Sequence, residues 1–243
     1  MIDLSVVIPA FNEERTIIEL LNRVTAVLDG EPGLSSEVIL VDDGSTDRTA
    51  ELGETFNHLS VSVVRQEHNS GKGAAVQRGI RESTGRYVLV QDADVEYFPE
   101  DIPAMLATLD DTTQRAVYGS RVLGAHVHVR GWRGRCGLWP GQGMPQRVAN
   151  LLLRALFRRL HGLSISDPLT GYKLYPSTLF DHWTPTSTGF ETDHEITCRL
   201  IELSIPIVEV PVKYSPRTRA EGKKIKARDL LIAVRTISNG SRK

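Results

Sequence analysis

Short apolar runs alternate with longer stretches of mixed polarity through the first two-fifths of the chain. This alternation limits the possible folds more than any other feature. Four short runs rich in Val, Ile and Leu are typical of buried strands, at residues 4–9, 38–41, 61–64 and 87–90. The segments between them are predicted helices, at residues 13–28, 46–56 and 73–82. Strands and helices that alternate through short links predict an α/β fold with a mostly parallel sheet covered on both faces.

The rest of the chain is less regular. Two further strands are predicted at residues 117–120 and 207–212, and two helices at 146–160 and 190–203. The interval from about 125 to 145 is rich in Gly, Arg and Trp and has little periodicity. Because ordered structure resumes after it, this interval is predicted to be a mobile functional loop rather than a linker.

Composition excludes several classes of protein. A length of 243 residues suits one large α/β domain or at most two small ones. A net charge of −1 is too low for a dedicated nucleic-acid binder, and two cysteines form neither a disulfide framework nor a zinc site. There is no apolar stretch of about 20 residues, and the N-terminal residues lead us to expect no signal peptide. We therefore expect a soluble cytoplasmic protein in a reducing compartment.

Polar clusters follow the predicted strands one after another, at residues 9–14, 42–47, 69–73 and 91–96. In an open parallel sheet, ligands bind beyond the carboxyl ends of the strands. Asp92 and Asp94 alternate along an extended segment, so both carboxylates can line one side of it. Such oxygen ligands suit Mg²⁺ or Mn²⁺, although a solvated strand end or helix caps near residues 99–109 would explain the same acids.

Two other clusters have a binding and a structural interpretation. Asp42 or Asp43 could accept hydrogen bonds from a ribose or a base, but the segment around them is also good turn and cap chemistry. Gly71 and Gly73 would let the backbone approach a phosphate, with Lys72 as a point charge. This segment lacks the spacing of a P-loop.

Taken together, the motifs are far more specific than each alone. Pro9–Glu13, Val41–Asp47, Gly71–Gly73 and Asp92–Asp94, in this order and spacing, resemble glycosyltransferase family 2. Within the family, the chain is most similar to dolichol-phosphate mannose synthases and bacterial polyprenyl-phosphate glycosyltransferases. Later segments agree, at residues 119–121, 167–173, 190–195 and 217–224. The resemblance covers nearly the whole chain except roughly residues 125–145.

The resemblance implies a single GT-A domain over residues 1–243, with 1–123 mainly binding a nucleotide sugar and 124–243 mainly binding the acceptor. It implies inverting transfer of a hexose from a GDP-mannose or UDP-glucose type of donor to a polyprenyl or dolichyl phosphate at the cytoplasmic membrane face. A divalent ion, Mg²⁺ or Mn²⁺, is the implied cofactor. The chain departs from the mannose synthases at Glu96, where they usually carry Gln, and this adds charge to the implied metal site.

The same resemblance assigns the site residues. The nucleotide sugar would be bordered by Pro9, Asn12, Glu13, Asp42, Lys72, Asp92, Ala93, Arg217 and Lys223. The metal would be surrounded by Asp92, Asp94 and Glu96, and catalysis would rest on Asp94, Arg121 and Asp193. A lipid phosphate is already anionic and needs no general base. A hydroxyl acceptor would need one, and Asp193 is the candidate unless it is merely a solvated or capping acid at a helix start.

Several alternatives stay open. The acceptor could be a soluble hydroxyl compound, or the chain could bind nucleotide sugars without catalysis, which the intact set of charged motif residues argues against. His126, His128 and His194 are predicted to be surface histidines rather than metal ligands. Trp132 and Trp139 could stack on a sugar, meet a lipid interface or anchor the loop.

The membrane interpretation rests on two basic segments. Residues 146–160 carry Leu151, Leu152 and Leu153 beside four arginines, Arg147, Arg154, Arg158 and Arg159. Such a helix could lie on an anionic membrane surface. The favoured alternative is an ordinary helix that packs its apolar side on the sheet and turns its arginines to water. The basic run at residues 213–228 could hold the acceptor phosphate, the donor diphosphate or lipid head groups, or be a solvated charge run.

Overall fold

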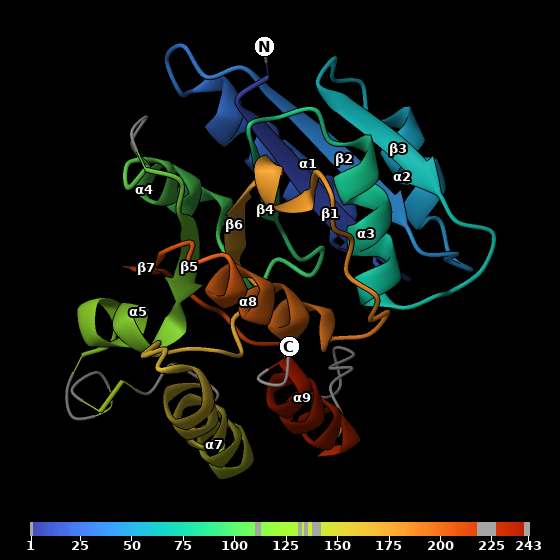
Figure 1. Ribbon diagram of the computed structural model, residues 1–243. Helices are drawn as coiled ribbons and strands as arrows, with labels where there is room; N and C mark the ends of the chain where they lie inside the picture. The colour runs from blue at the N-terminus through green and yellow to red at the C-terminus, as the bar shows by residue number, and fades with distance from the viewer. Residues whose placement is uncertain are drawn as a thin grey trace.

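A seven-stranded sheet forms the centre of the molecule in the computed structural model (Figure 1), which describes residues 2–109, 113–130, 133, 136–137, 142–217 and 227–240. The strand order is β3-β2-β1-β4-β6-β5-β7. Strand β6 runs antiparallel to both of its neighbours, and the other pairs are parallel. The strands are β1 Leu4–Ala10, β2 Ser36–Asp42, β3 Val61–Arg65, β4 Tyr87–Val90, β5 Ala116–Ser120, β6 Lys173–Pro176 and β7 Ile207–Pro211. The predicted mostly parallel sheet is confirmed.

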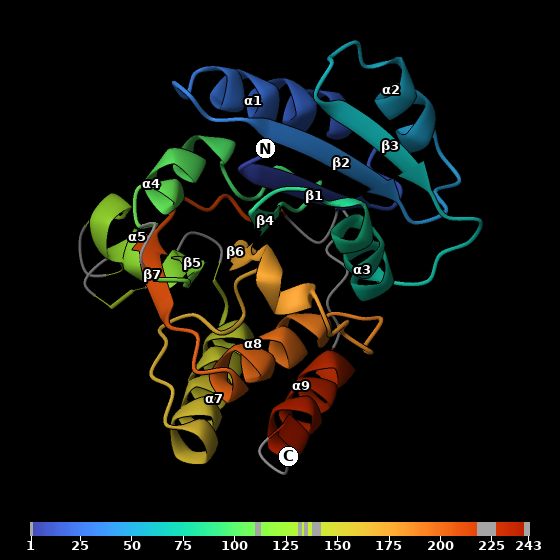
Figure 2. The same cartoon turned by 45° about the horizontal axis from the view of Figure 1, so that its top comes forward.

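Helices cover both faces of this sheet (Figure 2). One face carries α1 (Ile17–Asp29) and α2 (Thr49–Thr55), and the opposite face carries α3 (Lys72–Glu82) and α8 (Thr192–Glu202). Two further helices, α7 (Met144–His161) and α9 (Ala227–Gly240), pack together beyond α8, away from the sheet. The shorter elements are η1 Pro99–Asp101, α4 Ile102–Leu106, α5 Arg121–His128 and η2 Ser177–Phe180.

The core follows from the apolar runs of the sequence. Alternate residues of β1 face opposite sides, so that Val6 and Ile8 pack with Leu20 and Leu21 of α1, while Val7 packs toward α3. All five side chains are fully buried. Burial of an aliphatic side chain of this size contributes about 1.5–3 kcal/mol. The continuous apolar runs therefore specify strands buried on both faces.

Some elements differ from the sequence-based expectation. Strand β6 was not predicted, because its four residues, Lys-Leu-Tyr-Pro, begin with a charge and end with a proline. Helix α9 was not predicted either. The predicted loop at 125–145 is wrong at both ends, since α5 continues to His128 and α7 begins at Met144. Much of the interval between these two helices lies outside the described residues, together with Trp132 and Trp139.

Helix α7, the first of the two basic segments, packs differently from the expectation. Helix α7 buries Leu153 and Phe157 against α9 and α8 rather than mainly on the sheet, and it buries Asn150 beside Asp167. Leu151 and Leu152 lie exposed beside the exposed arginines. Within the described residues, no helix is both long and apolar enough to cross a membrane.

Candidate active site

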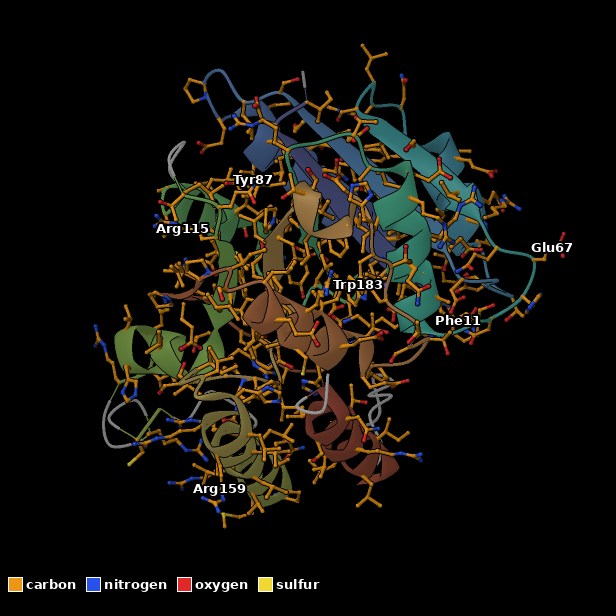
Figure 3. All side chains as sticks on the ribbon, viewed as in Figure 1. Phe11, Glu67, Tyr87, Arg115, Arg159 and Trp183 are labelled. Carbon is orange, nitrogen blue, oxygen red and sulfur yellow. The ribbon has the colours of Figure 1, made fainter. Side chains whose placement is uncertain are left out.

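The predicted functional segments converge on one edge of the sheet. Strands β1, β2, β3 and β4 are parallel, so the segments that follow them meet at the same edge. Phe11, which follows β1, is labelled in Figure 3. Because β6 is antiparallel, its first residue, Lys173, pairs with the last residue of β4, Val90. Strand β6, which was not predicted, thus places the motif at residues 167–173 at the sheet edge where the parallel strands end.

Asn12 joins the first two of these segments. Its backbone N–H donates to Ser45 Oγ at 2.9 Å, and its side-chain Oδ1 accepts from the Thr46 N–H at 2.9 Å. The residue adopts a left-handed backbone with φ of 54°, which asparagine tolerates better than most residues. Pro9 is half-buried in β1, where it pairs with Val41. The proposed contact of Asn12 with a nucleotide therefore has to coexist with this structural bond.

The two neighbouring aspartates at the end of β2, Asp42 and Asp43, have different hydrogen-bond partners. Asp43 accepts hydrogen bonds from Gln66, Ser70 and Gly71 through both oxygens, at 2.8–3.0 Å. Asp42 accepts only from the Ser45 N–H through Oδ2, and among the described residues its buried Oδ1 has no partner. Asp43 is therefore a structural residue, and Asp42 is the one with an acceptor left for a ribose or base.

Lys72 lies at the start of α3 and pairs with Asp92, with Nζ 2.6 Å from Oδ1. Burial favours the neutral amine, but the charges of Asp92 and Asp193 outweigh it and hold the pKa of Lys72 above its usual value. Gly73 serves packing, since a Cβ there would lie 2.0 Å from Thr192 Oγ1. Gly71 and Gly73 thus let α3 pack closely against residues 188–192, and their contact with a phosphate remains a prediction.

An acidic cluster with one arginine in it follows β1 and β4. Arg217 contacts Asp94 at 3.0 Å and both carboxylate oxygens of Glu13 at 2.9 and 3.2 Å. Burial and the neighbouring carboxylates of Asp92 and Glu96 raise the pKa of Asp94 to about 7. These acids are poorly solvated and close together, so the cluster favours the binding of positive charge.

The backbone beside Asp94 is strained. Val95 has a φ of 52°, a region that β-branched residues rarely enter and that costs roughly 1–3 kcal/mol. This turn separates the Asp94 and Glu96 side chains. Ala93 is buried, and its carbonyl accepts from Thr16 Oγ1 at 2.9 Å, which ties the segment to the start of α1. Strained backbone of this kind concentrates at functional sites.

Glu96 accepts several hydrogen bonds from the segment after β7. Its carboxylate accepts from the Tyr214 hydroxyl and from the Arg217 N–H, the latter at 2.7 Å. Its carbonyl accepts from the Ser215 N–H at 2.9 Å. In this structure the residue is thus an anchor for residues 214–217, and its role as a metal ligand remains a prediction.

A divalent ion fits this site in one particular way. Within the described ranges, no three His, Cys, Asp or Glu side chains converge to form a metal site by themselves. Mg²⁺, however, is commonly held by one or two carboxylates together with phosphates of the substrate. Asp94, desolvated and already paired with a cation, is suited to that role, and Asp92 lies two residues away on the same segment. The residues therefore fit a metal that arrives with a diphosphate.

Arg121 is buried in a bidentate ion pair. Its Nε and Nη2 donate to the two oxygens of Asp167 at 2.7 and 2.9 Å, and its backbone N–H donates at 3.1 Å. Asn150 of α7 donates to the same carboxylate at 2.9 Å. The Tyr214 ring centroid lies 5.0 Å from the guanidinium. The structure thus uses Arg121 to join α5, α7 and the segment before β6, and phosphate binding by Arg121 remains a prediction.

Asp193 lies half-buried in the first turn of α8, and its charge contributes to the raised pKa of Lys72. Behind it is a polar group that sequence reasoning missed. Lys173 is fully buried, 4.8 Å from the Tyr118 ring centroid, and its Nζ has no hydrogen-bond partner among the described residues. Burial lowers the pKa of this lysine. The only sequence signal for Lys173 was its place in the 167–173 motif.

The remaining predictions concern the three histidines and Lys223. His126 and His128 are exposed, as expected for surface histidines, but His194 is buried and that prediction is wrong. The buried His194 ring lies 6.1 Å from that of Phe157. Lys223 lies outside the described residues.

The fold and site define an α/β protein whose sheet edge gathers acids and cations suited to a nucleotide diphosphate and a metal. The model of the family described as "Glycosyl transferase family 2" matches residues 5–181. The chain belongs to glycosyl transferase family 2, and its fold is the GT-A fold. The resemblance noted from the motifs is confirmed.

Curated relatives include two dolichol-phosphate mannosyltransferases. The one from Pyrococcus furiosus is 30% identical over 221 residues, which is 90% of this chain and 58% of the relative. The one from Saccharomyces cerevisiae is 28% identical over 235 residues, 91% of this chain and 81% of the relative. The dodecaprenyl-phosphate galacturonate synthase of Rhizobium johnstonii is 38% identical over 183 residues, 73% of this chain and 49% of the relative. The chain thus spans only about half of the length of some relatives.

Solved structures with a similar fold include glucosyl-3-phosphoglycerate synthase from Mycobacterium tuberculosis in complex with phosphoglyceric acid. The TM-score is 0.70 at 22% identity, and the match covers 99% of this chain and 80% of that one. Another structure of that protein, with Mn²⁺, UDP and glucosyl-3-phosphoglycerate, has a TM-score of 0.70 at 21% identity with the same coverage. At this level of identity the likeness concerns the fold.

Proposed function

We propose that this chain is an inverting glycosyltransferase that moves a hexose from a nucleotide diphosphate sugar, of the GDP-mannose or UDP-glucose type, to a polyprenyl or dolichyl phosphate at the cytoplasmic membrane face. The observation that carries the proposal is the meeting of Asp94, Lys72 and Arg217 at one edge of the sheet. This edge offers acids for a cation and cations for a diphosphate. The names of the curated relatives support the acceptor class.

The proposed donor site lies mainly within residues 1–123. Asp42 would accept from the ribose or base through its unpartnered oxygen, and Lys72 and Arg217 would meet the diphosphate. Asp94, with Asp92, would hold Mg²⁺ or Mn²⁺. The metal would offset the charge that develops on the departing nucleoside diphosphate. Structures of similar fold that contain UDP with Mn²⁺ or Mg²⁺ support this choice of ions.

The acceptor would be bound mainly by residues 124–243. A lipid phosphate supplies an anionic oxygen and requires no side chain to remove a proton. The second candidate function is transfer to a soluble hydroxyl compound, and one observation favours it: Asp193 stands half-buried in the first turn of α8, where its charge helps to raise the pKa of Lys72. A carboxylate in that state could accept the proton of a hydroxyl.

Substitution of Asp193 by Asn separates the two acceptor classes. With short-chain polyprenyl phosphate as acceptor, we expect the kcat of Asp193→Asn to stay within about tenfold of the wild type. General-base catalysis contributes about 10²–10⁴-fold, so a loss of that size would indicate a hydroxyl acceptor. Asp29→Asn is the matched control, because Asp29 is an exposed acid on α1 that pairs with His58.

We also propose that the outer surface of α7 and α9 rests on the membrane. Met144, Val148 and Leu151 lie at i, i+4 and i+7 on one side of α7, and all are at least half exposed. Exposed Leu152 and, on α9, Leu231 and Ile232 add to this apolar surface. Arg159 projects outward from α7 (Figure 3), and Arg154 and Arg158 are also exposed. Exposed leucines flanked by arginines suit the surface of an anionic bilayer.

A further inference from the structure

Arg217 lies inside the acidic cluster that we propose for the metal. Its Nη1 is 2.9 Å from Glu13, its Nη2 is 3.0 Å from Asp94, and its Nε is 3.9 Å from Glu96. One guanidinium thus neutralises carboxylates from the segments after both β1 and β4. These acids are largely buried, so the positive charge of Arg217 compensates them where water cannot.

Hydrogen bonds hold the backbone of residues 214–217 in place, whereas the long side chain of Arg217 can rotate. The Arg217 N–H donates to Glu96 Oε1 at 2.7 Å, and the Ser215 N–H donates to the Glu96 carbonyl at 2.9 Å. The Tyr214 ring packs at a tilt against that of Tyr97, with ring centroids 5.0 Å apart. The guanidinium can therefore change partners by side-chain rotation, without release of residues 214–217 from the sheet edge.

We propose that Arg217 is a built-in counter-cation that competes with the divalent metal for Asp94, and that turns to the donor diphosphate when the metal binds. The second half of this inference rests on the proposed function, while the competition does not. A divalent ion and a guanidinium bound to the same carboxylate repel each other strongly in a poorly solvated site, because like charges then lie a few ångströms apart. Metal binding at Asp94 therefore favours release of Arg217 from that carboxylate.

The competition has a thermodynamic signature. Metal that binds alone must compete with Arg217 for Asp94. A nucleoside diphosphate offers the displaced guanidinium a new anionic partner, so metal and diphosphate should strengthen each other's binding. Removal of the guanidinium should therefore tighten the binding of metal alone and weaken the coupling between metal and diphosphate. A residue that only helps to bind the diphosphate would not affect metal alone.

The test measures Mn²⁺ binding by calorimetry or by the EPR signal of free Mn²⁺, first without nucleotide and then with saturating UDP or GDP. We expect Arg217→Gln to bind Mn²⁺ alone about tenfold more tightly than the wild type, which is about 1.4 kcal/mol. The factor by which UDP or GDP tightens Mn²⁺ binding should shrink in the same variant. Arg78→Gln is the control, because Arg78 pairs with Glu82 on the solvent side of α3.

Two further measurements keep the test decisive. Loss of Arg217 leaves the acids uncompensated, so Mn²⁺ should raise the melting temperature of Arg217→Gln by more than that of the wild type. Arg217→Lys retains a positive charge but cannot make the bidentate contact, and should bind Mn²⁺ with an intermediate affinity.

Mn²⁺ affinity in Arg217→Gln equal to or below that of the wild type would overturn the proposal. If that variant does not fold, unchanged affinity in Arg217→Lys would do so. A chain without transferase activity could still show the competition, so the two proposals fail separately.

Discussion

At the level of single residues, the charged groups at the sheet edge are paired with one another across long distances in the sequence. Lys72 pairs with Asp92, and Arg217 pairs with Asp94. Loss of one partner of a buried pair costs about 3–5 kcal/mol, because the other charge is left uncompensated. The metal and diphosphate we propose would replace these internal partners with equivalent charges, so the site could bind a highly charged ligand without stranding its own groups.

His194 gives a prediction about stability and pH. Burial, and secondarily the charge of Lys173, lowers the pKa of the folded histidine to about 3. The unfolded chain titrates near 6.5, so between these values the unfolded state binds more protons. The stability contributed by neutral His194 is complete above pH 6.5 and falls as the pH drops, by about 1.4 kcal/mol per unit.

The measurement is the free energy of urea unfolding at pH 7.5, 6 and 5. The decrease toward low pH should be shallower in His194→Gln, whose side chain does not titrate, than in the wild type. His58→Gln is the matched control at a partly exposed histidine, which pairs with Asp29. Equal slopes for His194→Gln and the wild type would show that this histidine is not held neutral.

At the level of elements, the sequence predicts those strands and helices that have a clear local pattern of apolar residues. Strands β1 and β4 are continuous apolar runs, and the structure confirms them with almost the same bounds. Strand β6 depends on its place between β4 and β5, which no local pattern shows. Its buried Lys173 contradicts the apolar pattern of a central strand. The segment was therefore recognised as a motif but not as a strand.

The packing of α5 on the segment after β7 gives a second prediction. A Cβ at Gly124 would lie 1.8 Å from the Val212 carbonyl oxygen, so any side chain there forces α5 away. We expect Gly124→Ala to lower the free energy of unfolding by about 2 kcal/mol or more, as overpacking against fixed backbone does.

Urea denaturation of Gly124→Ala beside Val127→Ala provides the check. Val127 is 65% exposed on the same helix, so its variant should stay within about 0.5 kcal/mol of the wild type. A Gly124→Ala protein as stable as the wild type would mean that α5 does not approach β7 so closely. The Arg121–Asp167 pair, which depends on this approach, would then need reinterpretation.

At the level of the whole molecule, the sheet edge and the outer surface of α7 and α9 are the two functional surfaces we propose. Sequence reasoning located the strand-end clusters correctly because parallel strands must end together. It could not assign their partners, since contacts such as Arg217 with Asp94 join residues far apart in the chain. It also could not show that α7 buries Leu153 and exposes Leu151, because that depends on the position of α9.

The membrane proposal predicts binding to vesicles of phosphatidylglycerol and phosphatidylcholine, measured by co-sedimentation, and weaker binding to phosphatidylcholine alone. The double variant Leu151→Glu and Leu152→Glu should reduce binding about tenfold or more, since it places charge in the apolar surface. Leu59→Glu is the control, because Leu59 is fully exposed in the turn before β3. Equal loss in both proteins, or no loss in the double variant, would contradict the proposed surface.

The most direct test of the central claim is transfer of label from nucleotide sugar to lipid. The protein would be incubated with a panel of radiolabelled nucleotide sugars, Mg²⁺ or Mn²⁺ and a short-chain polyprenyl phosphate, and label would be counted in the organic phase. We predict metal-dependent label from one donor, reduced at least about 100-fold in Asp94→Ala and retained in Asp29→Ala. No organic label from any donor, with transfer to a soluble hydroxyl compound under the same conditions, would contradict the account.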